Sequence, residues 1–177
     1  SITTVLCKIF GSQFIVLRYY GVIERLVFIA IVFLLVKRVY NEKITFISLL
    51  TAAIIYISNV QDVFFSYYQS AFLFAFVGLL FCIKMLEKPN NMCKYAFWFG
   101  ISSGISFLMK QNVGSLFAIV VGICVACFLY KEHKRDVIYS GFIAFFSANF
   151  IIAGVGLYLY FNDALFPFLN QIFSGAS

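Results

Sequence analysis

The sequence predicts an all-α integral membrane protein, a polytopic bundle of about six helices that span the bilayer. Apolar residues make up 63% of the chain and charged residues 11%, and the mean hydropathy is +0.99. A soluble chain could not hold 24 Phe and 11 Tyr without large apolar patches on its surface. The apolar residues form continuous runs rather than alternating with polar ones, which argues against the strands of a membrane β-barrel.

Polar interruptions divide the chain into apolar segments, most of which approach the roughly 20 residues that a helix needs to cross a bilayer. The short segment 95–109 can span if Met92 and Cys93 extend it, with Lys94 and Lys110 reaching the two surfaces. Residues 1–177 contain two Pro and no Gly/Ser-rich linker, so they are expected to form one transmembrane domain. The expected helical segments are 14–36, 44–60, 63–85, 95–109, 113–130 and 137–161.

Basic residues gather in alternate connections between these segments. Since cytoplasmic loops of membrane proteins carry an excess of Lys and Arg, the basic connections are predicted to be cytoplasmic and both chain ends to lie outside. This orientation places Asp62, the turn at 110–112 and the tail after residue 161 at or near the outer surface. The residues that set it are Lys37, Arg38, Lys43, Lys84, Lys88, Lys94, Lys131, Lys134 and Arg135.

The start of the chain favours a segment of a longer protein. It begins with Ser1, and its first residues lack the basic, apolar and small-residue regions of a signal peptide. No phosphate-binding loop, dinucleotide fingerprint or hydrolase elbow occurs in the sequence, so the chemistry of soluble enzymes is not expected within it. The lipid bilayer is an expected partner, and nucleic-acid binding is not expected.

Lys110 is the most informative charged residue, because it is the one basic residue in the connections predicted to face outside. One interpretation is a lysine that reaches the membrane surface as an anchor. The other is an anion site, since an ammonium with three donors suits the oxygens of a lipid phosphate. Gln111 can add a neutral donor beside it.

Arg18, Glu24 and Arg25 carry charges within the first segment. Arg18 and Arg25 are seven residues apart and therefore share a helix face. Charges at membrane depth usually face the protein interior or a wet cavity. Glu24 and Arg25 are expected to form a compensating pair within the bundle, and the alternative is that the arginines line a site for an anionic substrate.

Asp62 is the one carboxylate between the second and third segments. A single exposed Asp is often a solvated helix cap. The sharper interpretation is an active-site carboxylate at the outer face. It cannot form a metal site by itself, because a metal would need partners from elsewhere.

Three other patterns predict structure rather than chemistry. Gly100 and Gly104 form a Gly-x-x-x-Gly pair, which predicts close packing of helices. Cys124 and Cys127 have the spacing of a redox or zinc motif, but they lie within an apolar segment and are interpreted as core residues. His133 lies in a basic connection with no other metal ligand set around it and is interpreted as solvated.

Two stretches carry a family resemblance. The first runs from Cys7-Lys8-Ile9-Phe10-Gly11 to Leu17-Arg18-Tyr19-Tyr20, and the second is GISSGISFLMKQNVG at 100–114. They resemble the start of the second helix and the Gly-x-x-x-Gly…Lys-Gln stretch of the GT-C glycosyltransferases, which include protein O-mannosyltransferases and aminoarabinose transferases. The resemblance covers about residues 5–130.

The resemblance implies a helical bundle that takes a sugar from a polyprenyl-phosphate carrier and transfers it to an acceptor at the outer or lumenal membrane face. Lys110 becomes a candidate for binding the carrier phosphate. The family's main catalytic Asp lies before the matched region, and this sequence has no counterpart to it. Asp62 falls in the outer loop where some members carry a second acidic residue, so it is the candidate catalytic residue, with Gln111, Arg18 and Arg25 as further candidates for substrate binding.

Two other function classes stay open at this level. A transporter or channel would predict broken helices and polar residues at mid-membrane, and the segments hold few of these. A structural subunit of a membrane complex is equally compatible with the composition.

No metal site is predicted, although the family reaction leaves the use of a divalent metal open. The expected location is the plasma membrane of a bacterium.

Overall fold

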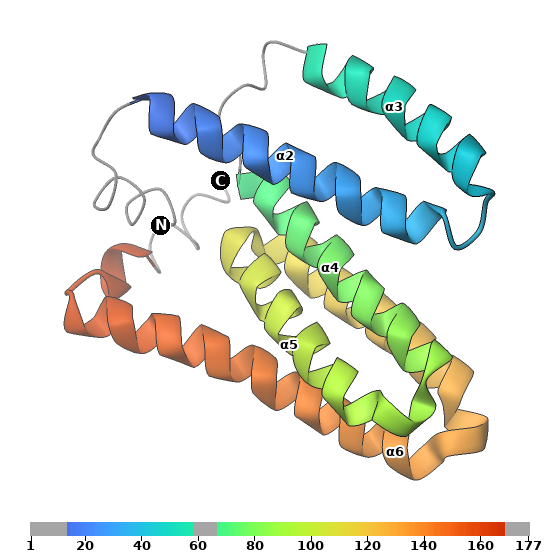
Figure 1. Cartoon of the computed structure of the whole chain (residues 1–177). Helices are drawn as coiled ribbons and strands as arrows, with labels where there is room; N and C mark the ends of the chain where they lie inside the picture. Colours follow the sequence, from blue (N-terminus) through green and yellow to red (C-terminus); the bar gives the residue numbers. More distant parts are fainter. Residues whose placement is uncertain (1–13, 59–66, 169–177) are drawn as a thin grey trace.

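The computed structural model describes residues 14–58 and 67–168, and these form an arrangement of packed helices without a strand (Figure 1). This architecture confirms the predicted all-α class. A last helical turn covers residues 165–168. The other elements, in chain order, are α2 (Phe14–Val36), α3 (Glu42–Ser58), α4 (Tyr67–Glu87), the short 3-10 helix η2 (Pro89–Asn91), α5 (Met92–Met109) and α6 (Gln111–Phe161).

α6 turns back on itself. It has 51 helical residues, which in a straight helix would extend about 77 Å, far beyond the roughly 30 Å of a bilayer core. Figure 1 shows instead that its ribbon runs behind α4, bends sharply and returns below α5. We call Gln111–Cys127 the first arm and Arg135–Phe161 the second arm of α6. The two arms correspond to the last two segments expected from the sequence.

The sequence-based boundaries are right at one helix and displaced at others. The first expected segment coincides with α2, and α5 begins at Met92, as its extension required. One expectation is wrong. The connection between 130 and 137 is not a loop, because the backbone stays helical through it. A cluster of charged residues at a membrane surface can be solvated without breaking the backbone hydrogen bonds of a helix.

α5 lies at the centre of the bundle. Phe99 belongs to a buried cluster, and side chains from both arms of α6, including Phe117 and Ala144, pack against it. Three serines of α5 are also buried: Ser102, Ser103 and Ser106. The buried members of the cluster are Cys82, Met85, Met92, Ala96 and Phe99.

Glycines set the distance between α5 and the second arm of α6. A Cβ atom on Gly100 would lie 2.0 Å from Ser147 Oγ and 2.2 Å from the Ala144 carbonyl oxygen. One on Gly104 would lie 2.9 Å from the Ala148 carbonyl oxygen. The Gly-x-x-x-Gly pair therefore marks a close helix contact, which confirms its interpretation as a packing signal.

The outer surface of the bundle is apolar, as a lipid-facing surface requires. Three described helical stretches are long and apolar enough to cross a membrane: Arg18–Val36, Tyr68–Glu87 and Arg135–Phe161. Large apolar side chains such as Phe145 and Phe150 are exposed on the second arm of α6. Cys124 and Cys127 are free and exposed rather than in the core, so their interpretation as core residues is wrong.

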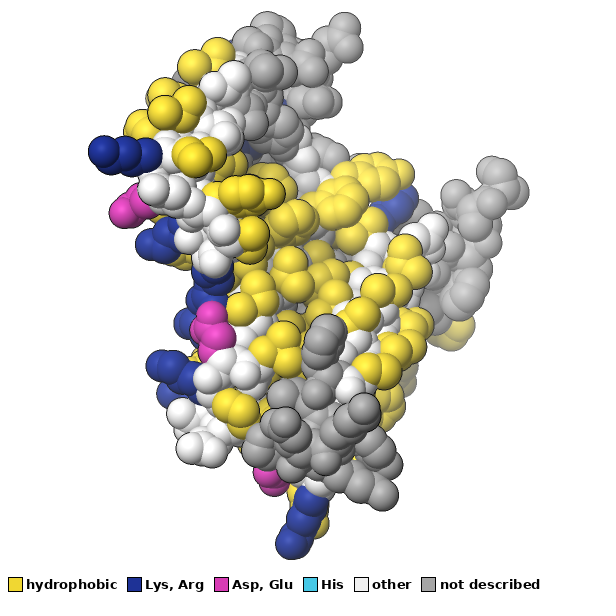
Figure 2. All heavy atoms as spheres, turned by 90° about the vertical axis from the view of Figure 1, so that its right-hand side faces the viewer, with side chains coloured by type: hydrophobic (Ala, Val, Ile, Leu, Met, Phe, Trp, Pro, Cys, Tyr) yellow, Lys and Arg dark blue, Asp and Glu magenta, His cyan; other side chains and the backbone are white. Residues whose placement is uncertain are grey.

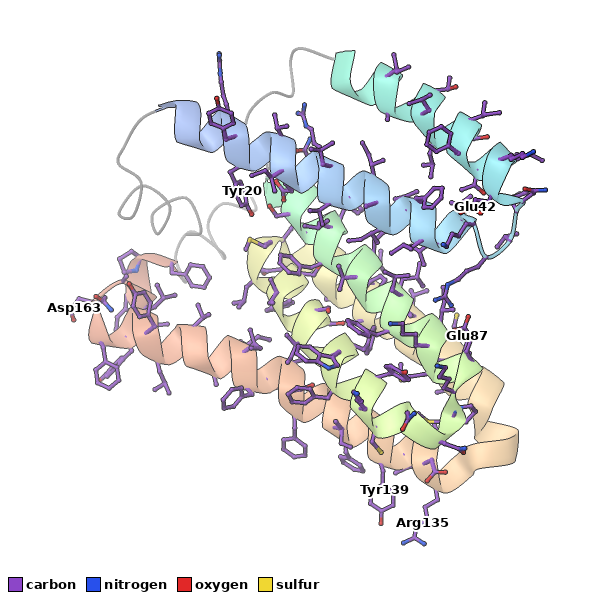
Figure 3. The ribbon with its side chains drawn as sticks, in the orientation of Figure 1. Tyr20, Glu42, Glu87, Arg135, Tyr139 and Asp163 are labelled. Atoms are coloured by element: carbon purple, nitrogen blue, oxygen red, sulfur yellow. The ribbon has the colours of Figure 1, made fainter. Side chains whose placement is uncertain are left out.

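The charged connections gather at one end of the bundle. The ends of α2 and α4 and the bend of α6 lie toward the right of Figure 1, and Figure 3 shows Glu42, Glu87 and Arg135 at this end. Arg38 Nη1 forms an ion pair with Glu87 Oε1, which joins the connection after α2 to the end of α4. Figure 2, viewed from this side, shows most of the visible basic and acidic side chains along one edge and an apolar centre.

Candidate functional site

The candidate site is built around the first turn of α4, at the end of the bundle opposite the charged connections. Tyr68 of this turn contacts Lys110, and Ser70 contacts Glu24 of α2. Figure 1 shows why these elements meet: α4 begins beneath the middle of α2, close to the point where α5 ends and α6 begins. A single helical turn therefore touches both charged groups.

Lys110 is the one residue between α5 and α6, and its backbone is extended (φ −151°, ψ 106°). Its N–H donates to the Ser106 carbonyl oxygen at 2.9 Å, and its own carbonyl accepts from the Gly114 N–H at 3.0 Å. A Cβ on Gly114 would lie 2.3 Å from Phe107 N, so the two helices approach each other very closely just after this residue. The position of Lys110 is therefore fixed by the backbone on both sides.

The Lys110 side chain is oriented by an aromatic residue. Its Nζ atom donates a hydrogen bond to Tyr68 Oη at 2.8 Å and lies 4.2 Å from the centroid of the same ring. One turn earlier, Ser106 Oγ donates to the Ala71 carbonyl oxygen at 2.8 Å, which ties the end of α5 to the start of α4. Lys110 is half-buried as a residue, and its ammonium contacts Tyr68 at an exposed position beside the helix junction.

Glu24 is a carboxylate held inside the bundle. It is 4% exposed, and its Oε1 atom accepts a hydrogen bond from the fully buried Ser70 hydroxyl. Its second oxygen, Oε2, is buried without a hydrogen-bond partner among the residues that the structure describes. Tyr20 lies one turn before Glu24 on α2 and points toward the start of α4 (Figure 3). α2 therefore carries a polar side into this crossing.

A cavity of about 220 Å³ opens beside Glu24, between α2 and α4. Its surface is almost entirely apolar, because the polar atoms of the lining residues are themselves buried. Gln69 Oε1, like Glu24 Oε2, has no hydrogen-bond partner in the described part of the chain. Aromatic rings form the rest of the wall, and Phe28 and Phe76 contact each other edge to face with centroids 5.2 Å apart. The lining residues are Glu24, Arg25, Phe28, Gln69, Phe72 and Phe76.

The two candidate arginines have different environments, although they share a helix face. Arg25 is 7% exposed and lines the cavity, whereas Arg18 is exposed. Of the two arginines, Arg25 is therefore the one that the structure places on the cavity wall.

The remaining candidates are placed unequally. Gln111 is the first residue of α6 and lies directly beside Lys110, half-buried. Asp62 lies outside the described residues, as does the side chain of His133. No group of three His, Cys, Asp or Glu side chains that could hold a metal ion occurs within the described ranges.

The sequence interpretation missed the part that α4 contributes. Three consecutive residues of α4 take part in the site. Tyr68 contacts Lys110, Gln69 lines the cavity, and Ser70 contacts Glu24. A signal was available, because three consecutive side chains with polar ends lie near the start of the otherwise apolar segment 63–85. What the sequence could not supply was the partner of each, which depends on how α4 packs against α2 and α5.

The family model described as "Dolichyl-phosphate-mannose-protein mannosyltransferase" matches residues 2–158. The chain belongs to this family. No curated protein and no solved structure matches the chain.

Membership in the mannosyltransferase family confirms the resemblance to GT-C glycosyltransferases. The match extends from before α2 to within three residues of the end of α6, so it includes both the Lys110 junction and the α2–α4 cavity. Together with the apolar helices, it identifies an integral membrane protein of a glycosyltransferase family.

Proposed function

We propose that the chain is part of an enzyme that transfers a sugar from a polyprenyl-phosphate carrier to an acceptor at the outer face of a bacterial plasma membrane. Lys110 binds the carrier phosphate. The observation that carries this proposal is the geometry of Lys110, a half-buried residue whose backbone is fixed between two helices and whose ammonium donates to Tyr68 Oη at 2.8 Å.

The helix ends around Lys110 favour an anion at the same place. α6 begins at Gln111 directly after Lys110, so the amino-terminal end of this helix lies beside the Lys110–Tyr68 contact. The first N–H groups of a helix lack partners within the helix, and its dipole is positive at this end. A phosphate near Lys110 would receive donors from this backbone, with Gln111 as a neutral side-chain donor.

The proposed reaction needs a base that accepts the acceptor proton and a cation that stabilises the departing phosphate. The acceptor oxygen forms a bond to the anomeric carbon of the sugar, and the bond from that carbon to the phosphate oxygen breaks. The electron pair of the broken bond stays on the carrier phosphate, and the acceptor proton goes to a carboxylate base. Lys110 offsets the charge that develops on the departing phosphate.

The candidate carboxylate is Asp62, five residues before the first residue of α4. Asp62 is near in sequence to Tyr68, which orients Lys110, and this nearness in sequence is the support for the assignment. A second carboxylate from outside this chain is expected to supply the main base. Arg25 is proposed to add positive charge near the substrate from the α2–α4 cavity, and Arg18 is proposed to do so from its exposed position on α2.

Family membership favours this function over the transporter and the structural subunit. A transporter or channel predicts interrupted helices near mid-membrane, whereas α2 and α4 are continuous from end to end. The interruption at Lys110 lies instead at a helix junction, where a lipid headgroup can reach it.

The test is the full-length protein carrying Lys110→Ala or Lys110→Arg, assayed for binding of polyprenyl phosphate and for sugar transfer in membranes. We expect Ala to weaken carrier binding by about tenfold or more at unchanged expression, since a charge-assisted hydrogen bond is lost. Arg should retain part of the binding. Lys94→Ala is the matched control, because Lys94 is exposed at the opposite end of α5. Unchanged binding and turnover in Lys110→Ala would overturn the proposal.

A further inference from the structure

A shallow groove, the α5–α6 groove, runs between α5 and the second arm of α6 on the lipid-facing surface of the bundle. Its volume is about 460 Å³, and its surface is almost entirely apolar. Six of the lining residues come from the second arm at helical spacing, from Tyr139 to Phe150, and Phe97 of α5 lines the groove from the other helix. The rings of Tyr139, Phe146 and Phe150 are exposed, so the groove is open to the bilayer.

The length of the groove corresponds to one leaflet of a bilayer. Tyr139 and Phe150 are eleven residues apart, which is about 17 Å along a helix axis. Half of a bilayer core of roughly 30 Å is about 15 Å. Arg135 is the first residue of this membrane-spanning stretch, and Tyr139 follows it by one turn. The groove therefore begins near the membrane surface at the charged end of the bundle and ends near mid-membrane.

The width of the groove favours a single hydrocarbon chain over a helix. Over this length, the volume corresponds to a mean cross-section of about 30 Å². A helix with its side chains is about 10 Å across and needs about 80 Å², so it is too wide to enter the groove. A hydrocarbon chain, whose atoms contact their neighbours at about 4 Å, needs only about 20 Å². The groove therefore fits one acyl chain of a lipid.

The end of the groove near the membrane surface carries a cation. The guanidinium carbon of Arg135 lies 5.6 Å from the centroid of the Tyr139 ring, which itself lines the groove. Figure 3 shows both side chains projecting from the same side of the second arm. Arg135 is exposed, and among the described residues it has no ion-pair partner. Its guanidinium is therefore available to an anion at the mouth of the groove.

The charge of the surrounding surface also favours an anion. The described residues of the connections at this end, with the helix ends beside them, include seven basic and three acidic side chains. Clusters of Lys and Arg beside membrane-spanning helices attract the headgroups of anionic lipids. The basic side chains are Lys37, Arg38, Lys43, Lys84, Lys88, Lys94 and Arg135, and the acidic ones are Glu42, Glu87 and Asp136.

We propose that the α5–α6 groove holds one acyl chain of an anionic phospholipid and that Arg135 binds the phosphate of the same molecule. Arginine suits this role, because its guanidinium can donate two parallel hydrogen bonds to phosphate oxygens. A zwitterionic lipid fills the groove equally well but gains less from Arg135, because its own ammonium already compensates its phosphate. The inference does not depend on the proposed function, since Lys110 lies at the opposite end of the bundle.

Two substitutions test the headgroup and the acyl chain separately. Arg135→Gln removes the cation, and Lys43→Gln is its control, because Lys43 is exposed at the same end of the bundle but belongs to α3. Phe146→Ala removes a ring of the lining. Phe145→Ala is its control, because Phe145 is 64% exposed against 66% for Phe146 but lies outside the lining.

The measurement is the binding of phosphatidylglycerol and of phosphatidylcholine to the full-length protein, followed by native mass spectrometry. We expect the wild type to bind phosphatidylglycerol more tightly. Arg135→Gln should weaken phosphatidylglycerol binding about fivefold and leave phosphatidylcholine binding unchanged, since one basic residue at a membrane surface is lost. Phe146→Ala should weaken the binding of both lipids about threefold, because each places an acyl chain against the same ring. Lys43→Gln and Phe145→Ala should keep the wild-type affinities.

Other outcomes would overturn the lipid site. Equal effects of Arg135→Gln and Lys43→Gln would show that the basic surface attracts anionic lipid without a defined position. Equal effects of Phe146→Ala and Phe145→Ala would show that the groove does not hold the chain. A mass of two protein chains without bound lipid would show that a second copy covers this face instead.

One further variant separates the lipid site from the phosphate site proposed at Lys110. Lys110→Ala should leave phosphatidylglycerol binding unchanged, because Lys110 lies at the other end of α5 from the mouth of the groove. Loss of phosphatidylglycerol in Lys110→Ala, with wild-type binding in Arg135→Gln, would place the anionic lipid at Lys110 and overturn the inference. If Lys110→Ala kept its affinity for polyprenyl phosphate while Arg135→Gln lost phosphatidylglycerol, the proposed function would fail and the lipid site would stand.

Discussion

Lys110 and Tyr68 are separated by 42 residues in the chain, yet the ammonium of Lys110 donates to the Tyr68 hydroxyl at 2.8 Å and lies 4.2 Å from the ring centroid. This contact distinguishes two uses of a membrane lysine. A lysine that serves as a membrane anchor needs only to place its ammonium in water, and a hydrogen bond to a particular side chain does not help it to do so. A lysine held over an aromatic ring is oriented before a ligand arrives, which lowers the cost of binding.

The Tyr68 contact can be tested by removing its two parts separately. Tyr68→Phe removes the hydroxyl and keeps the ring, whereas Tyr68→Leu removes both. Because Tyr68 is 50% exposed, each part is expected to contribute about 1 kcal/mol or less. We expect Tyr68→Phe to weaken polyprenyl-phosphate binding by up to about fivefold and Tyr68→Leu to weaken it further. Wild-type affinity in Tyr68→Leu would show that the ring does not orient Lys110 for the carrier.

Close helix packing gives a second prediction, at Gly100. Alanine is the better helix former by about 1 kcal/mol, so Gly→Ala at an open helix position should stabilise the protein. At Gly100 the added methyl would lie 2.0 Å from Ser147 Oγ and 2.2 Å from a backbone oxygen of Ala144. α5 and the second arm of α6 must then separate, and we expect a net loss of about 1–3 kcal/mol in the free energy of unfolding.

The control for Gly100→Ala is Gly122→Ala in the first arm of α6. A Cβ on Gly122 would meet no atom within 4 Å. Thermal unfolding of the detergent-solubilised protein should therefore show a lower midpoint for Gly100→Ala and an equal or higher one for Gly122→Ala. If both variants shifted in the same direction, the close approach at Gly100 would not be a feature of the folded protein.

The sequence predicted the helices better than it predicted how they connect. α2 matched its expected range because a long apolar run with clear polar ends leaves little choice of boundary. The bend of α6 was expected to be a loop, since the cluster from Lys131 to Arg135 interrupts the hydropathy pattern. A charged interruption in the hydropathy pattern indicates where the chain reaches the membrane surface. It does not indicate whether the backbone remains helical at that point.

The candidate site was predicted only in part. Lys110 could be singled out because it breaks the charge asymmetry of the connections, which is a property of the sequence alone. The contact of Glu24 with Ser70 could not be predicted from the sequence. The two residues are 46 positions apart and meet only because α2 crosses the start of α4. Serine is common in apolar helices, so nothing in the sequence marked this one as the partner of a buried carboxylate.

The orientation of the bundle in the membrane gives the last prediction. Glu42 at the start of α3 and Asn90 in η2 are both exposed, and they lie in connections that the basic residues predict to be cytoplasmic. The ion pair of Arg38 with Glu87 joins these two connections, so both positions should lie on the same side of the membrane. Asn112, exposed at the start of α6, should lie on the other side.

The measurement is labelling of single-cysteine variants by a membrane-impermeant thiol reagent added to intact cells. The five native cysteines are first replaced, because at least Cys93, Cys124 and Cys127 are free and exposed. We expect Asn112→Cys to be labelled from outside, and Glu42→Cys and Asn90→Cys to be labelled only after the membrane is permeabilised. Labelling of Glu42→Cys and Asn90→Cys from outside, with protection of Asn112→Cys, would reverse the orientation and place Lys110 at the cytoplasmic face. Different behaviour of Glu42→Cys and Asn90→Cys would contradict the packing of α2 beside α4, because one ion pair cannot join segments on opposite sides of a bilayer.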